Sequence, residues 1–393
     1  MRICATHNDS ILRKRALLDD VRAARIEDDG QLIDIGVVFH ISYRNYDQVK
    51  VQEDVAYTLD MMNKDFNKEN TNFDCGRGLY SSKSLKKTYD EYVNLAGPCN
   101  IRFQLVEIRY APVGVQSSSN ISVIDQNVKG ASPSVMPEKN LNIWVAEFSN
   151  GLLGYAQFPW ELAESPKTDG VVIGLDTFGR NPSSAEYNLN KTLTHEVGHW
   201  LGLYHVFQDT FDYDGGDIDY LTSEDPQELK GDCVADTPPQ GKPTYGNPLN
   251  STSSWPTSKA LDESKRYPHM FMNYMDYSDD IALFMFTQQQ AVKVRQMIHL
   301  YRPDILVKEV IKPPAEPVVE PVVEPVVEPV VEPVVEPVVE PVVEPVVEPV
   351  VEPVVEPVVE PVVEPVVEPV VDADLIQLKK NLELLLKLVN EKL

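Results

Sequence analysis

THEVGHWLGLYH, residues 194–205, holds three of the chain's seven histidines. Apolar residues recur at helical spacing before and within this stretch, which predicts a helix that ends near residue 202. His195 and His199 are four residues apart, so on a helix their imidazoles share one face and can bind one cation together. Glu196 lies about 100° round the helix from His195. From there its carboxylate can reach a water on the cation without being a ligand itself.

A glycine and a third histidine complete the pattern. Gly202 can take the left-handed conformation that ends a helix and turns the chain, which would bring His205 back towards the first two imidazoles. Three histidines leave a tetrahedral Zn²⁺ with one open position for water, which a closed structural site lacks. The metal lowers the pKa of this water towards about 7, and Glu196 can take its proton as it attacks a carbonyl group. A bare His-Glu-x-x-His often arises by chance, but the longer pattern seldom does.

HEVGHWLGLYH matches the motif HExxHxxGxxH of the metzincin zinc metallopeptidases. NYMDYSDD (273–280) resembles their methionine turn, and GDCVADTPPQ followed by MNYMDYSDD and MFTQQQ is similar to the pappalysin branch, over about residues 31–300. The resemblance implies a zinc cofactor and a polypeptide substrate. It also implies that Met275 forms the apolar floor under the zinc ligands, although by periodicity alone it is another core methionine. Tyr277 would hydrogen-bond the developing oxyanion; the alternative is a buried structural tyrosine.

The same resemblance implies a structural Ca²⁺ in the loop that contains GDCVADTPP. Asp232, Asp236 and Thr237 offer the oxygen ligands that calcium prefers, although acidic loop residues are commonly only solvated. Relatives tend to join this loop by a disulfide to a cysteine before the methionine turn, and the intervening sequence here has none. Cys233 is therefore expected to be unpaired, and the substrate preference of the family is not carried over.

Residues 1–30 form a polar, arginine-rich segment, which predicts a leader that is cut at a basic site such as ILRKR (11–15). RICAT (2–6) is similar to the short prosegment motif that places a cysteine thiolate on zinc in precursors of this family. Cys4 would then fill the position of the water and keep the enzyme latent; alternatively it is only a leftover thiol. No uninterrupted apolar stretch typical of a secretory signal is visible, so the compartment stays unknown.

Residues 31–305 are predicted to form one domain of the α/β or α+β class. Strands are expected at IDIGVVFHISY (33–43), NIRFQLVEIRY (100–110), LNIWVAEF (141–148) and GVVIGLDTFG (170–179). GLLGYAQFPW (151–160) reads as an edge strand, because its glycines and Pro159 would weaken a central one. Two long helices are expected, SAEYNLNKTLTHEVGHWLGLYH (184–205) and VQEDVAYTLDMMNKDFN (51–67), the latter with Val51, Val55, Leu59, Met62 and Phe66 on one face. The resemblance makes this a twisted mixed sheet whose edge strand lies over the cleft and pairs with an extended peptide.

The charge and the cysteines exclude few functions. The formal net charge is −26, of which the tail repeat supplies 14 negative charges, so the remainder carries −26 + 14 = −12. This balance argues against nucleic acid and anionic membranes as partners. No apolar run approaches the roughly 20 residues of a transmembrane helix. Cys75 and Cys99 could pair around the loop between them, or they are free thiols in a reducing compartment.

The C-terminal part differs in composition from the domain. Residues 306–371 form a linker rich in Pro, Glu and Val, in which EPVV is repeated 14 times over 316–371. Proline at every fourth position forbids helix and regular strand pairing, so we expect a disordered, extended spacer with a reach on the order of 170 Å. Residues 372–393 predict an amphipathic helix with the seam of a short coiled coil, which suggests a homo-oligomer or a docking partner. A solitary helix is the alternative.

Two classes of function remain from the sequence. The first is a zinc endopeptidase tethered through a long spacer to an oligomer or a partner. The second is a non-catalytic zinc-binding module that keeps the protease fold and is displayed on the spacer. Glu196 and all three histidines are present, which favours the enzyme.

Overall fold

The structure is a computed structural model that describes residues 4, 6, 29–70, 83–180, 183–207, 232–238, 240, 242–248, 257–259 and 266–307. The chain divides into two units, Met1–Glu320 and Pro321–Leu393, and every described residue belongs to the first. The EPVV repeat, the helix expected at 372–393, Cys75 and most of the leader lie outside the described residues. The structure and roles predicted for these segments from the sequence therefore stay predictions. Cys99 carries a free, buried thiol.

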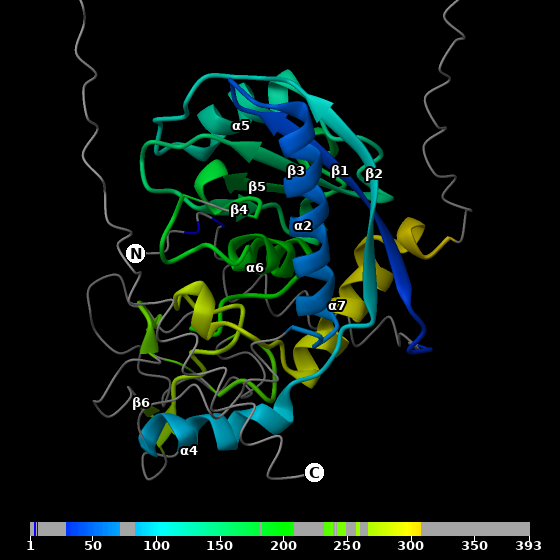
Figure 1. Ribbon diagram of the computed structural model, residues 1–393. Coiled ribbons are helices and arrows are strands. Elements are labelled where there is room, and N and C mark those ends of the chain that lie inside the picture. Colours follow the sequence, from blue (N-terminus) through cyan, green and yellow to red (C-terminus); the bar gives the residue numbers. More distant parts are fainter. Residues whose placement is uncertain are drawn as a thin grey trace, which may run out of the picture. The chain divides into compact units, whose positions relative to one another are not determined.

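A five-stranded mixed sheet forms the centre of the fold, in the order β2-β1-β3-β5-β4 (Figure 1). The strands β1 (Ile33–Ser42), β2 (Ile101–Tyr110), β3 (Asn140–Ala146) and β5 (Val171–Gly174) are parallel to one another. The short strand β4 (Gly154–Ala156) pairs antiparallel with β5 at one edge. The expected mixed sheet with GLLGYAQFPW at its edge is therefore confirmed.

Helices pack against the central strands of the sheet. The central strands are mostly apolar on both faces, so both faces need this cover. Every residue of β3 and β5 is buried, as expected for parallel strands with helical crossovers. Helix α2 (Gln48–Phe66) follows β1 in the chain and lies across the strands (Figure 1). It begins at Asp47, whose carboxylate accepts hydrogen bonds from the backbone N–H groups of residues 49 and 50. Its predicted apolar face is buried, with Leu59 partly so.

The helix that carries the histidine motif is shorter than predicted. Helix α6 spans Lys191–Trp200, and all ten residues are buried against α2, β4 and β5. The expectation that the helix begins at residue 184 is wrong, because Asn190 has a left-handed backbone with φ 60° and interrupts any continuous helix there. Asp280 accepts hydrogen bonds from the backbone N–H groups of Leu189 and Lys191, which fixes this start.

Three further helices were not predicted. These are α4 (Lys83–Tyr92), α5 (Ile121–Ala131) and α7 (Gln288–Tyr301). Helix α7 is longer than α6 and begins with a capping box between Thr287 and Gln290. The strands β6 (Thr257–Lys259) and β7 (Arg266–Pro268) form a separate two-stranded antiparallel sheet. None of the helices in the described part of the chain is long and apolar enough to cross a membrane.

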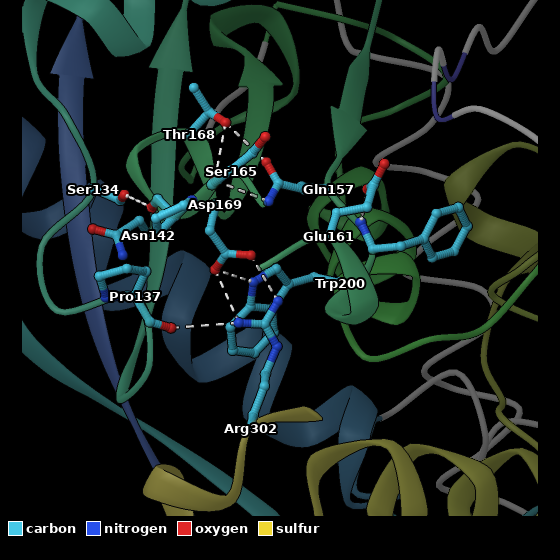
Figure 2. A network of polar contacts seen from close by, with 12 residues as sticks. Ser134, Pro137, Asn142, Gln157, Glu161, Ser165, Thr168, Asp169, Trp200 and Arg302 are labelled. Atoms are coloured by element: carbon cyan, nitrogen blue, oxygen red, sulfur yellow. Dashed lines mark hydrogen bonds and ion pairs between the residues drawn. The ribbon is translucent and has the colours of Figure 1, made fainter. Parts of the chain in front are cut away.

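A buried ion pair holds the C-terminal end of α6 against the rest of the domain (Figure 2). Arg302, after the end of α7, donates two hydrogen bonds of 2.8 and 2.9 Å to Asp169, and both side chains are fully buried. Trp200, the last residue of α6, donates from Nε1 to the same carboxylate at 3.0 Å. The Arg302 guanidinium also lies 3.8 Å from the centre of the Trp200 ring. The C-terminal ends of α6 and α7 and the approach to β5 are therefore held together at one point.

Candidate metal centre

Three imidazoles converge at the C-terminal end of α6. His195 Nε2 lies 3.2 Å from His205 Nε2, and His199 Nε2 lies 3.0 Å from the same atom. His195 and His199 are one helical turn apart on α6. His205 reaches them because Gly202 has φ +89°, the left-handed conformation expected at this position. The Leu203 N–H closes the turn by donating to the carbonyl oxygen of residue 198 at 2.9 Å.

The outer nitrogen atoms fix which way two of these rings face. His195 Nδ1 lies 2.6 Å from the carbonyl oxygen of Tyr274, and His199 Nδ1 lies 2.7 Å from that of Leu203. A carbonyl oxygen only accepts, so both Nδ1 atoms carry a proton, and in the neutral ring Nε2 then presents its lone pair to the other histidines. Burial lowers the pKa of His199 to about 4, which keeps its imidazole neutral as a metal ligand requires.

These lone pairs fit a zinc ion. Three neutral imidazole nitrogen atoms that face one another would repel unless a proton or a cation lay between them. A tetrahedral ion with Zn–N bonds of about 2.0–2.1 Å places its nitrogen ligands about 3.3 Å apart, close to the separations observed here. His195, His199 and His205 are therefore a donor set of the right number, type and spacing to hold Zn²⁺.

Cys4 places a sulfur atom, a potential fourth ligand, beside the three histidines. The Sγ atom and one nitrogen of each histidine all lie within 4.8 Å of one another, and this is the one such group among the described residues. Cys4 forms a parallel bridge with Gly154 of the edge strand β4. Burial, and then the Glu196 carboxylate, raise the pKa of its thiol, so a cation at the histidines is what would favour the thiolate there.

Glu196 is almost fully buried beside this group. Its Oε2 atom accepts from Cys4 Sγ at 3.3 Å and from Thr6 Oγ1 at 3.2 Å. Gly154 makes room for the carboxylate, because a Cβ atom at that position would lie 2.9 Å from Glu196 Cγ. The Thr6 hydroxyl also accepts from the Ala156 N–H at 3.0 Å. Thr6 was not predicted as a site residue, although it belongs to RICAT (2–6).

Met275 and Tyr277 flank the histidines from the segment after β7. Met275 is fully buried under α6, where a Cβ atom on Gly198 would meet its Sδ atom at 2.5 Å. The Tyr277 ring lies 5.0 Å from the ring of His205, between centroids, and its hydroxyl donates to the Cys4 carbonyl oxygen at 3.5 Å. The structure thus brings both residues to the histidine cluster, as the resemblance implies.

Only two of the three residues expected to bind calcium contact each other in this loop. Thr237 Oγ1 donates to Asp232 Oδ1 at 2.6 Å. Asp236 instead faces the start of α7, where its two oxygen atoms accept from Thr287 Oγ1 and from the Gln289 N–H. Asp236 therefore caps a helix, and calcium at this loop remains a prediction.

The chain is similar to known metallopeptidases. Residues 129–299 match the M43 peptidase family model described as Pregnancy-associated plasma protein-A. An extracellular metalloprotease of Arthroderma otae is 34% identical over 211 residues, which are 52% of this chain and 67% of that protein. One of Verticillium alfalfae is 39% identical over 169 residues, 42% of this chain and 51% of that protein. The chain spans about half the length of most of the curated relatives that it matches.

Two solved structures share the fold over most of their length. A mutant of Tannerella forsythia promirolysin is 25% identical with a TM-score of 0.60, covering 78% of this chain and 97% of that one. Mature mirolysin of the same organism, in complex with a cleaved peptide, is 29% identical with a TM-score of 0.52, covering 70% and 98%.

Proposed function

The chain belongs to the pappalysin family of metallopeptidases, and from this premise we propose that it is a zinc endopeptidase with Glu196 as its general base. The observation that carries the proposal is the convergence of three buried Nε2 atoms beside a buried carboxylate. A purely structural site would have no use for a buried base beside the fourth ligand position. The names of the relatives support an extracellular setting.

The roles of the residues follow from their positions. His195, His199 and His205 would hold zinc, which when bound supplies a Lewis acid and lowers the pKa of water at the remaining position. The Glu196 carboxylate takes a proton from the attacking water and returns it to the departing amine. The Tyr277 hydroxyl, which donates to a backbone carbonyl oxygen beside the histidines, would donate to the oxyanion as it develops.

The edge strand β4 would bind the substrate backbone. A peptide segment of this chain already lies along it, because Cys4 bridges to Gly154 and Thr6 accepts from the Ala156 N–H. These contacts support the addition of an extended substrate to the same edge, where main-chain hydrogen bonds give affinity without fixing the sequence.

The leader would keep the enzyme latent by occupying three sites together. Cys4 Sγ lies at the histidines, Thr6 donates to Glu196, and both residues cover β4. A substrate cannot reach the ligands, the base or the strand while these contacts persist. The name of the related promirolysin indicates that it too is a precursor, which supports this proposal.

The deciding experiment compares zinc content and peptide hydrolysis for the full chain and for a chain without residues 1–30, with and without a chelator. We expect bound zinc in both, and chelator-sensitive hydrolysis only after the leader is removed. In the shortened chain, Glu196→Ala should keep zinc and lose about 10²–10⁴-fold in rate. Zinc bound by the shortened chain without hydrolysis of any protein would instead favour the non-catalytic zinc-binding module. Equal rates with and without Glu196 would refute the proposed role of the base.

A further inference from the structure

A buried carboxylate in α2 gathers three donors from two other segments of the chain. Asp65 Oδ1 accepts from Lys191 Nζ at 2.5 Å and from the Tyr274 hydroxyl at 2.8 Å, and Oδ2 accepts from Thr194 Oγ1 at 2.7 Å. All four residues are at most 3% exposed. Burial and the Asp65 charge raise the pKa of the Tyr274 hydroxyl, so it remains a donor.

Each of these donors lies next to the histidine cluster. Lys191 begins α6, and Thr194 immediately precedes His195. The carbonyl oxygen of Tyr274 accepts the Nδ1–H of His195 at 2.6 Å. The Tyr274 ring also faces the Lys191 ammonium, which lies 5.6 Å from its centre. Asp65 therefore holds both partners of one hydrogen bond, namely the helix that carries His195 and the residue whose carbonyl oxygen orients its ring.

We propose that Asp65 is a positioning residue for zinc, acting through Tyr274 on the tautomer and orientation of His195. The inference rests on the proposed zinc site. The outer hydrogen bond of a ligating imidazole fixes which nitrogen faces the metal and raises its basicity. At this site the acceptor is a backbone carbonyl, whose direction depends on how the Tyr274 residue is held. The Asp65 carboxylate anchors the side chain of that residue from a helix that carries none of the three imidazoles.

The first test removes only the hydroxyl group of Tyr274. In the full chain, Tyr274→Phe keeps the Asp65–Lys191 ion pair and the backbone carbonyl but loses the anchor. We expect zinc to bind about tenfold more weakly, measured by competition with a chromophoric chelator. We also expect the visible absorption spectrum of the Co²⁺-loaded protein to change, because it reports ligand geometry.

The chain offers a matched control for this variant. Tyr155 is also a buried tyrosine, and its hydroxyl donates at 2.6 Å to Asp125, which pairs with the buried Lys129 at 3.1 Å. Tyr155→Phe thus removes the same kind of hydrogen bond, here from an ion pair whose carboxylate is a quarter exposed and which does not include the histidines. We expect it to lose comparable stability and to keep the zinc affinity and Co²⁺ spectrum of the parent chain.

A second pair of variants covers the carboxylate itself. Removing Asp65 alone would leave the Lys191 charge buried and unpaired, which endangers folding. Asp65→Leu with Lys191→Met removes both charges together with the acceptor, and we expect the same tenfold loss of zinc affinity. Asp65→Asn with Lys191→Met restores an acceptor for Tyr274 and should recover most of that loss.

Two results would overturn the inference. One is zinc affinity within twofold of the parent chain in both Tyr274→Phe and the Asp65→Leu, Lys191→Met variant. The other is an equal loss in Tyr155→Phe, which would show that general destabilisation is the cause. Zinc affinity is measured without turnover, so a parent chain that binds zinc but hydrolyses no peptide would refute the proposed activity and not this role of Asp65.

Discussion

Replacing Gly202 with alanine adds one methyl group, and we expect it to lower both the stability of the domain and its affinity for zinc. Gly202 has φ +89° between His199 and His205, a conformation that costs an alanine about 1–2 kcal/mol. A Cβ atom there would also lie 2.6 Å from Met297 Cγ and 3.2 Å from its Cβ. Overpacking of this kind typically costs about 1–3 kcal/mol. We therefore expect Gly202→Ala to lower the free energy of unfolding by about 2–5 kcal/mol.

The measurement is urea unfolding of the chelator-treated chain, followed by tryptophan fluorescence. Trp144, Trp160 and Trp200 lie in the buried parts of the domain and report its loss. Gly30→Ala is the matched control, because Gly30 also has a left-handed backbone, φ +67°, but has no atom within 4 Å of the added Cβ. It should show only the cost of the backbone conformation, about 1–2 kcal/mol. The difference between the variants then measures the contact with Met297.

The strain in Gly202→Ala should also weaken zinc binding if the turn relieves the contact by moving the segment that ends in His205. Gly30→Ala should bind zinc as the parent chain does. If both variants lose the same stability, Met297 moves aside at no cost and the reasoning from close packing is wrong. If Gly202→Ala loses the full amount but binds zinc normally, the turn and the third ligand are not mechanically linked.

Three other perturbations have definite expected outcomes. Cys4→Ala in the full chain should release chelator-sensitive peptide hydrolysis without removal of the leader; persistent latency would mean that other leader contacts suffice. Burial lowers the pKa of His40 to about 4, against about 6.5 in the unfolded chain. The unfolded chain therefore takes up the proton first, so the stability due to His40 is complete above about pH 6.5 and falls by about 3 kcal/mol as the pH drops towards 4. Urea unfolding should show a smaller fall in His40→Gln than in the parent chain, by about this amount; a fall remains in both, because burial also lowers the pKa of His199 and of His269 to about 4. Deletion of 316–393 should leave hydrolysis of small peptides by the leader-free chain unchanged but reduce its hydrodynamic size by more than the lost mass explains; an unchanged oligomeric state would contradict the coiled coil.

The sequence was most informative where chemistry depends on local spacing. The i, i+4 pair of His195 and His199 and the glycine turn before His205 are short-range patterns, and the structure brings the three imidazoles together. The alternating and apolar runs likewise predicted all five strands of the central sheet. The edge position of β4 followed from its glycines and Pro159.

Long-range contacts could not be predicted in this way. The start of α6 is set by Asp280, some ninety residues downstream, which accepts from two N–H groups around Asn190. Periodicity alone extended the helix through this point. Helix α7 was missed, although Thr287 and Gln290 have the spacing of a capping box. Asp65 could not be distinguished from the other charged residues of an amphipathic helix, because its three partners lie about 130 to 210 positions away in the sequence.

The leader contacts have a consequence for how activation would proceed in time. Cys4 and Thr6 lie at the metal centre, and residues 7–28 join them covalently to the rest of the domain, as a tether joins a ligand to its receptor. A tethered ligand of this kind experiences an effective concentration in the millimolar range. One cut anywhere in the tether leaves every contact at the site in place but makes the inhibitor a separate molecule. At micromolar protein, its local concentration then falls about a thousandfold, which is equivalent to about 4 kcal/mol. Dissociation of the cut fragment, rather than the cut itself, would then set the lag before the first turnover, and dilution after cleavage would shorten it.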